Sequence, residues 1–147
     1  MAAIALLGAV ALAACGDDDD GGGNSAASAN AEVLNAIAFI DGAGLHAIDE
    51  SINTDKTVPA TAKTTSDKVQ TVLNITTWPK DLQSQAKALS DIMAGLSASL
   101  EGDKPDLAKA GEAATKAHEG SHDFSHAVWD YLYKQGGVAD SDAAHAD

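Results

Sequence analysis

Three histidines recur every four residues in the segment AHEGSHDFSHAVWDYLYK. They are His118, His122 and His126. Side chains four positions apart lie on the same face of an α-helix, so two neighbouring imidazoles of this series can bind one ion. Each four-residue step turns by about 40° around the helix axis, and one straight helix therefore cannot direct all three at the same ion. A metal site here needs a ligand from a second helix.

The sequence offers a carboxylate for that second helix. Counting back along an antiparallel N-terminal helix places Asp41 beside His118. The same count places Glu32 beside His126. Asp41 lies on an apolar stripe, where an unpaired carboxylate is costly, so we expect it to approach His118. With His122 the pair would suit zinc, copper, nickel or iron, whereas the alternative is a buried hydrogen-bonded pair that only fixes helix register.

A motif associated with zinc proteases overlaps the first two histidines. The run His118-Glu119-Gly120-Ser121-His122 resembles the HExxH motif, which implies two zinc ligands and a general base at Glu119. Gly120 weakens a helix by roughly 1 kcal/mol relative to alanine. A helical domain of this size also has little room for a third ligand and a substrate cleft. We therefore expect Glu119 to be at most an alternative to Asp41 as a metal ligand beside His118 and His122, and we expect the protein not to be an enzyme.

The elements that must position these residues are helices. Sustained alternation of apolar and polar residues is missing, while Pro59, Pro79 and Pro105 each precede a stretch with helical periodicity. The predicted helices cover residues 31–53, 59–76, 79–101 and 105–135, and Gly42 and Gly44 could bend the first. Their apolar stripes include Ile37 and Ile40 in the first helix, Leu89, Met93 and Leu96 in the third, and Leu107 in the fourth. Short connections favour an all-α, up-down-up-down four-helix bundle. On the first helix His46 maps opposite the apolar stripe, so it is not expected to join the histidine set.

Aromatic residues should gather at one end of this bundle. Trp78 begins the third predicted helix, and Trp129, Tyr131 and Tyr133 lie near the end of the fourth. Core and boundary packing explains such residues in most bundles. The alternative is a patch for a protein partner, close to the N-terminus of the first helix.

The N-terminal segment carries a different signal. Residues 2–14 are apolar or small, too few to span a bilayer but suited to a signal peptide, and they are followed by the only cysteine, Cys15. The sequence Leu12-Ala13-Ala14-Cys15 resembles the lipobox of bacterial lipoproteins. This resemblance implies cleavage before Cys15, acylation of its sulfur with chains such as palmitate, and a membrane anchor facing the periplasm or the cell exterior.

These signals predict four regions. A signal peptide occupies residues 1–14, an acylated cysteine and flexible acidic tether 15–30, the bundle 31–135, and a disordered tail 136–147.

The net charge of −13 argues against nucleic-acid binding. We expect a membrane-anchored extracytoplasmic lipoprotein that acts as a non-enzymatic binding or structural module. The alternative is a lipoprotein that senses, buffers or delivers a transition metal through its histidines.

Overall fold

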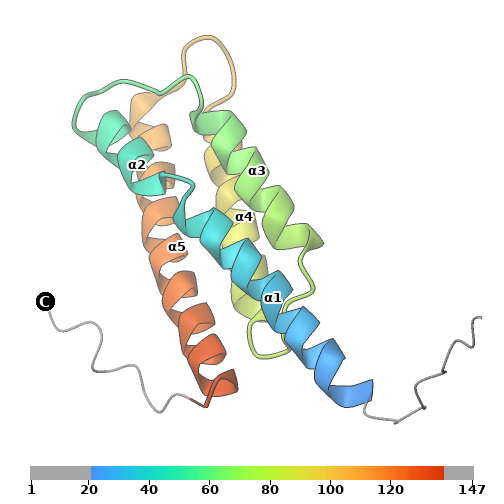
Figure 1. Ribbon diagram of the computed structural model, residues 1–147. Coiled ribbons are helices and arrows are strands. Elements are labelled where there is room, and N and C mark those ends of the chain that lie inside the picture. Colours follow the sequence, from blue (N-terminus) through green and yellow to red (C-terminus); the bar gives the residue numbers. More distant parts are fainter. Residues whose placement is uncertain (1–20, 138–147) are drawn as a thin grey trace, which may run out of the picture.

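The computed structural model describes residues 21–137, and within that range every regular element is an α-helix (Figure 1). The helices are α1 (Gly21–Asp41), α2 (Leu45–Asn53), α3 (Ala62–Ile75), α4 (Gln83–Ser99) and α5 (Leu107–Gln135). The predicted all-α helical bundle is therefore confirmed. The lipobox with Cys15 and most of the predicted tail, including His145, lie outside the described residues.

The first predicted helix is two helices. A turn at Gly42–Gly44 separates α1 from α2, and Gly44 adopts the left-handed conformation at φ 73° that glycine tolerates best. The chain therefore enters α2 in a new direction (Figure 1). At its other end α1 begins at Gly21 instead of near residue 31, so helix replaces the later part of the predicted tether. Residues 21–30 read GGGNSAASAN, a composition with weak helix propensity, so the extension depends on the packed turns that follow it.

The helices pack in a simple order. α3 packs on α4, α4 on α5, and α5 also contacts α1 and α2, while α1 reaches α3 (Figure 1). The core between them is built from aliphatic side chains at helical spacing. Its largest fully buried members include Ile37, Ile40, Ile52, Leu89, Met93 and Leu96. The predicted stripes of α1 and α4 supply most of these residues.

The inward face of α5 differs from the predicted one. Ala110, Ala117, Phe124 and Val128 are buried, whereas Leu107, expected on the stripe, is 38% exposed. α5 has neighbours on two sides, α4 on one and α1 with α2 on the other. A single apolar stripe could not identify both of the packed faces of α5, because the face that packs against α2 is made of small and polar residues.

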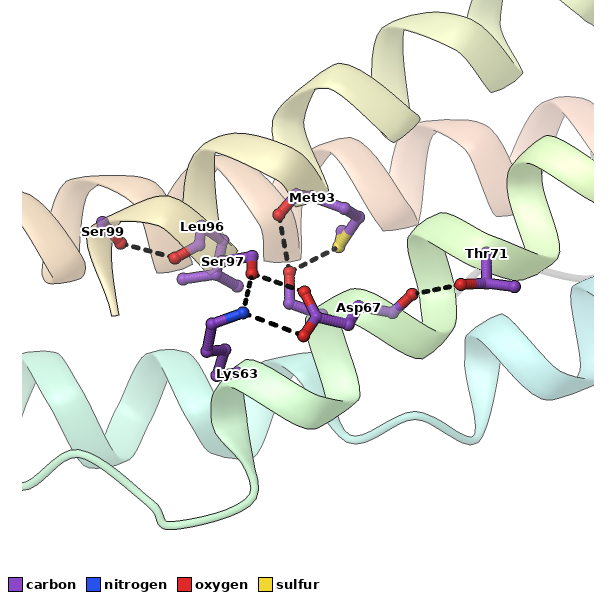
Figure 2. Close-up of polar contacts among 8 residues, drawn as sticks. Lys63, Asp67, Thr71, Met93, Leu96, Ser97 and Ser99 are labelled. Atoms are coloured by element: carbon purple, nitrogen blue, oxygen red, sulfur yellow. Dashed lines mark hydrogen bonds and ion pairs between the residues drawn. The ribbon is translucent and has the colours of Figure 1, made fainter. Parts of the chain in front are cut away.

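Two polar clusters fasten α3 to α4 (Figure 2). The buried Ser66 hydroxyl donates to the Met93 carbonyl oxygen at 2.7 Å. Nearer the N-terminus of α3, Lys63 Nζ lies 3.0 Å from Asp67 Oδ2 and donates to Ser97 Oγ at 2.9 Å. The Ser97 hydroxyl in turn donates to Asp67 Oδ1. Hydrogen bonds from Ser97 and then Lys63 hold the pKa of Asp67 below its ordinary value.

One described segment, Ala27–Asn53, is long and apolar enough to cross a membrane by length and composition alone. It lies near the N-terminus, as a signal or anchor sequence would, and is compatible with membrane association to that extent. However, its apolar residues Val33, Ile37 and Ile52 are buried in the bundle. Here the segment supplies core helices.

Candidate functional site

A partly enclosed groove of about 510 Å³ runs along α5, where the turn between α1 and α2 faces it. The groove contains all three histidines of the α5 series together with His46 of α2. Its lining residues are Ile40, Asp41, Gly44, Leu45, His46, His118, Ser121, His122, Ser125, His126, Trp129 and Tyr133. Most of these side chains are polar or aromatic, so the groove differs sharply from the aliphatic core.

The centre of the site is a pair of imidazoles from two helices. His46 Nδ1 lies 3.3 Å from His118 Nε2, and the two ring centroids are 4.7 Å apart with the rings inclined at 63°. His46 is exposed and His118 is half-buried. Two ring nitrogens from different helices therefore point at each other from the wall of the groove.

Asp49 supports His118 from the other side of its ring. Asp49 Oδ2 lies 3.2 Å from His118 Nδ1, and its Oδ1 accepts hydrogen bonds from Asn53 Nδ2 at 2.7 Å and Thr115 Oγ1 at 2.8 Å. Partial burial tends to raise the pKa of Asp49. The hydrogen bonds from Thr115, Asn53 and His118 outweigh that effect and lower the pKa. Asp49 is therefore an ionised carboxylate at neutral pH.

This arrangement fixes the chemistry of the His118 ring. An ionised carboxylate can only accept hydrogen bonds, so the His118 Nδ1 atom that faces Asp49 must carry a proton. In the neutral imidazole the other nitrogen, Nε2, then bears a lone pair. That lone pair is directed at His46. Without an ion, a proton on His46 Nδ1 would join the rings by one N–H···N hydrogen bond.

A third imidazole lies within reach. The His122 ring centroid is 4.9 Å from that of His118, and its side chain is exposed in the same groove. His126 lies one turn further along and also lines the groove. Within residues 21–137, no three His, Cys, Asp or Glu side chains are already arranged to hold a metal ion. A third ligand must therefore come from side-chain rotation or from water.

The predicted pairing of Asp41 with His118 is wrong. Asp41 Oδ2 accepts a hydrogen bond from Trp129 Nε1 at 3.1 Å, and Asp49 occupies the place expected for Asp41. The prediction treated residues 31–53 as one straight helix. The turn before α2 shifts its register along α5, so a residue eight positions later meets His118.

The same turn explains two further errors. His46, expected to face away, lies in the site because α2 is rotated relative to α1. Glu32 was expected beside His126, yet its Oε1 accepts a hydrogen bond from the Thr77 backbone N–H at 2.7 Å. Its carboxylate thus binds the connection between α3 and α4.

Glu119 does not share the groove with the histidines. It is exposed and borders a separate depression together with Asn53 and Gly111. The two histidines of the HExxH run therefore have no glutamate between them on the groove side. The geometry of a metalloprotease base is not assembled here.

The predicted aromatic patch is divided. Trp78 is only 6% exposed and packs edge-to-face on Phe124, with centroids 4.9 Å apart. Trp129 and Tyr133 line the groove with centroids 6.0 Å apart, whereas Tyr131 makes a hydrogen bond to α1. Trp78 thus belongs to the core, and two of the four aromatics belong to the histidine site.

Sequence reasoning missed Asp49, Asn53 and Thr115. Asp49 and Asn53 are four residues apart, a spacing that places both on one face of α2, and this was the available signal. To use this signal, one must also know which face of α2 packs against α5. No protein-family model matches this chain, and neither curated proteins nor solved structures gave a match, so the site must be interpreted from its own chemistry.

Proposed function

We propose that this protein is a membrane-anchored, non-enzymatic lipoprotein that binds one transition-metal ion between His46 and His118. The observation that carries the proposal is the 3.3 Å distance between His46 Nδ1 and His118 Nε2. Two imidazole nitrogens bonded at 2.0–2.1 Å to a tetrahedral zinc ion are roughly 3.3 Å apart. The spacing of the two nitrogens thus already suits an ion, which would replace the shared proton once both rings turn to direct their lone pairs at it.

Asp49 supplies the second argument. A metal-bound histidine commonly donates its other N–H to a carboxylate, which fixes the tautomer and makes the ligand nitrogen more basic. The contact between His118 Nδ1 and Asp49 Oδ2 at 3.2 Å has this form. His122 is the nearest candidate for a third ligand, with its ring centroid 4.9 Å from that of His118.

The donor set favours particular metals. Imidazole nitrogens suit zinc, copper and nickel, and also iron, better than calcium or magnesium, which prefer oxygen. No cysteine sulfur is available in the bundle, since Cys15 is the only cysteine. We expect zinc and copper(II) to bind most tightly. The acidic chain, with a net charge of −13, would attract such cations.

The lipobox resemblance gives the metal site a location. Acylation at Cys15 would hold the bundle at the outer face of a membrane, where a histidine groove can buffer, sense or hand on a metal.

We infer an up-down-up-down order for the four helical segments, counting α1 with α2 as one. The order in which neighbouring helices pack supports it.

Metal binding is tested with the full chain carrying no histidine tag. The protein is dialysed against zinc, copper(II) or nickel, and the retained metal and its dissociation constant are measured by elemental analysis and calorimetry. We expect one ion per chain. His46→Ala and His118→Ala should each weaken binding at least tenfold, since each removes a ligand.

His126→Ala is the matched control, because His126 lines the same groove on the same helix but lies outside the pair. It should change the affinity much less. Absence of retained metal in the wild type contradicts the proposal. So does equal loss in all three variants, because that indicates diffuse histidine binding.

The anchor is tested separately with Cys15→Ser. In cells labelled with a fatty acid, the wild-type chain should carry label and sediment with membranes. The variant should lose both, because its side chain has no sulfur to acylate. A Ser28→Ala variant serves as a control outside the lipobox. A labelled Cys15→Ser chain would contradict acylation at this residue.

A further inference from the structure

The side-chain amide of Asn53 lies in the interface between α2 and α5, which we call the seam, and is not itself a candidate metal ligand. Asn53 Nδ2 lies 2.7 Å from Asp49 Oδ1, 3.1 Å from the Gly111 carbonyl oxygen and 3.1 Å from Thr115 Oγ1. Thr115 Oγ1 also donates to Asp49 Oδ1 at 2.8 Å. Two hydrogen-bond donors therefore converge on the carboxylate oxygen that does not face His118.

A glycine makes room for this amide. A Cβ atom at Gly111 would lie only 2.2 Å from Asn53 Oδ1, so no other residue fits there without displacing the asparagine. Glycine inside a helix costs roughly 1 kcal/mol relative to alanine. Gly111 lies in the second turn of the long helix α5 and bears that cost where Asn53 meets the helix.

We propose that Asn53 is a positioning residue for the metal site, seated by Gly111 and assisted by Thr115. It orients Asp49 so that the carboxylate accepts a hydrogen bond from the Nδ1–H of His118, which leaves the Nε2 lone pair directed at His46. The inference rests on the proposed metal function. Its specific content is that His118 is held as the Nδ1–H tautomer before any metal arrives.

Docking of α2 does not by itself account for the network. Leu45, Ile48 and Ile52 are already buried and fasten α2 to the bundle. Asn53 is exposed at the end of the helix, where water could satisfy its amide. Its contacts to Gly111 and Thr115 join α2 to α5. Its contact to Asp49, together with that of Thr115, instead holds the carboxylate that faces His118, and docking alone does not need these two hydrogen bonds.

The first test measures the tautomer without metal. Long-range proton–nitrogen NMR spectra distinguish an Nδ1–H imidazole from an Nε2–H one, and a His118→Gln variant assigns the signal. In the neutral ring, the wild type should show His118 protonated on Nδ1. Asn53→Ala should give a mixture of tautomers. Asp49→Asn should favour Nε2–H, because its amide can donate to Nδ1.

The second test measures zinc affinity in three variants of the seam. Asn53→Ala and Gly111→Ala should each weaken zinc binding about tenfold. Losing a group that hydrogen-bonds to a metal ligand typically costs about 10- to 100-fold in affinity, and the expected loss lies at the lower end of that range. The double variant Asn53→Ala/Gly111→Ala removes the clash and gains a helix-favouring alanine. It should recover stability without recovering affinity or the Nδ1–H tautomer.

Asn74→Ala is the matched control, because Asn74 accepts a hydrogen bond from Ser90 across the α3–α4 interface, away from the groove. It should leave tautomer and affinity unchanged. A wild-type His118 in the Nε2–H form overturns the inference, as does full recovery of affinity in the double variant. A wild type that binds no zinc overturns the proposed function, while the metal-free tautomer still decides the role of Asn53.

Discussion

Two helix interfaces in this protein carry polar networks, and they differ in where their hydrogen bonds end. Between α3 and α4, Ser66 and Ser97 each donate to a partner within the interface, and Ser66 is fully buried (Figure 2). Between α2 and α5, the chain of contacts runs from Asn53 through Asp49 to His118 and opens into the groove at His46. The first network is closed, whereas the second ends on a pair of imidazoles in the groove.

The difference indicates two uses of polarity. Hydrogen bonds that close within an interface fix the register of two helices and contribute a modest net stability. A network that ends on a half-exposed imidazole contributes less to the fold, because water can replace its last contact. It can instead orient a ligand nitrogen. Perturbing the two interfaces should therefore separate stability from metal affinity.

The largest effect on stability is expected from Met93→Ala in the α3–α4 interface. Met93 is fully buried, and truncating such a side chain costs about 2–5 kcal/mol through lost burial and the cavity left behind. Chemical denaturation measures the loss. Zinc affinity measured where the variant is still folded should stay within twofold of the wild type. A parallel tenfold loss of affinity would show that the two interfaces are not independent.

Gly44→Ala should act on both properties. Gly44 adopts φ 73°, where an alanine costs about 1–2 kcal/mol, and a Cβ there would meet no atom within 4 Å, so the effect comes from the backbone alone. Because α2 begins at this turn, zinc binding should weaken together with stability. Thermal unfolding and calorimetry measure the two effects.

Gly102→Ala is the matched control for that substitution. Gly102 has φ 84° and equally open surroundings, but it lies between α4 and α5, away from the histidines. It should cost similar stability and leave zinc affinity unchanged. If both glycine variants weakened zinc binding equally, the turn before α2 would have no special role.

A smaller effect is expected from Ser66→Ala. The hydroxyl donates to the Met93 carbonyl oxygen at 2.7 Å in a buried position, and losing one such bond costs about 1 kcal/mol. Denaturant midpoints measure this loss. Thr71→Ala is the control, because it removes an exposed hydrogen bond from the Thr71 hydroxyl to the Asp67 backbone carbonyl oxygen in the same helix. It should change stability less than Ser66→Ala.

The smallest effect belongs to Asp67 and appears only in acid. Its folded-state pKa is lowered by Ser97 and Lys63, so its stabilising contribution is complete above the ordinary carboxylate pKa and disappears as pH falls through the folded value. Asp67→Asn should therefore lower stability at pH 6 and lose that deficit in strong acid. Urea unfolding across this range measures the change, and an equal deficit at every pH would contradict it.

The sequence alone was sufficient for the helical class and for most of the core. The stripe of α4, with Leu89, Met93 and Leu96, was predicted and is buried, because helical periodicity reports one buried face directly. The three histidines on one stretch of α5 were recognised for the same reason. Such features depend only on spacing within a single helix.

The partners of His118 could not be obtained in this way. They depend on how α2 is rotated and shifted along α5, and the turn at Gly42–Gly44 determines both. The glycines marked a possible bend, but their spacing gave neither its angle nor its phase. A register displaced by eight residues, about two helical turns, exchanges Asp41 for Asp49, and the rotation of α2 brings His46 into the site. Local spacing thus determined which residues α5 offers, and only tertiary packing decided which residues meet them.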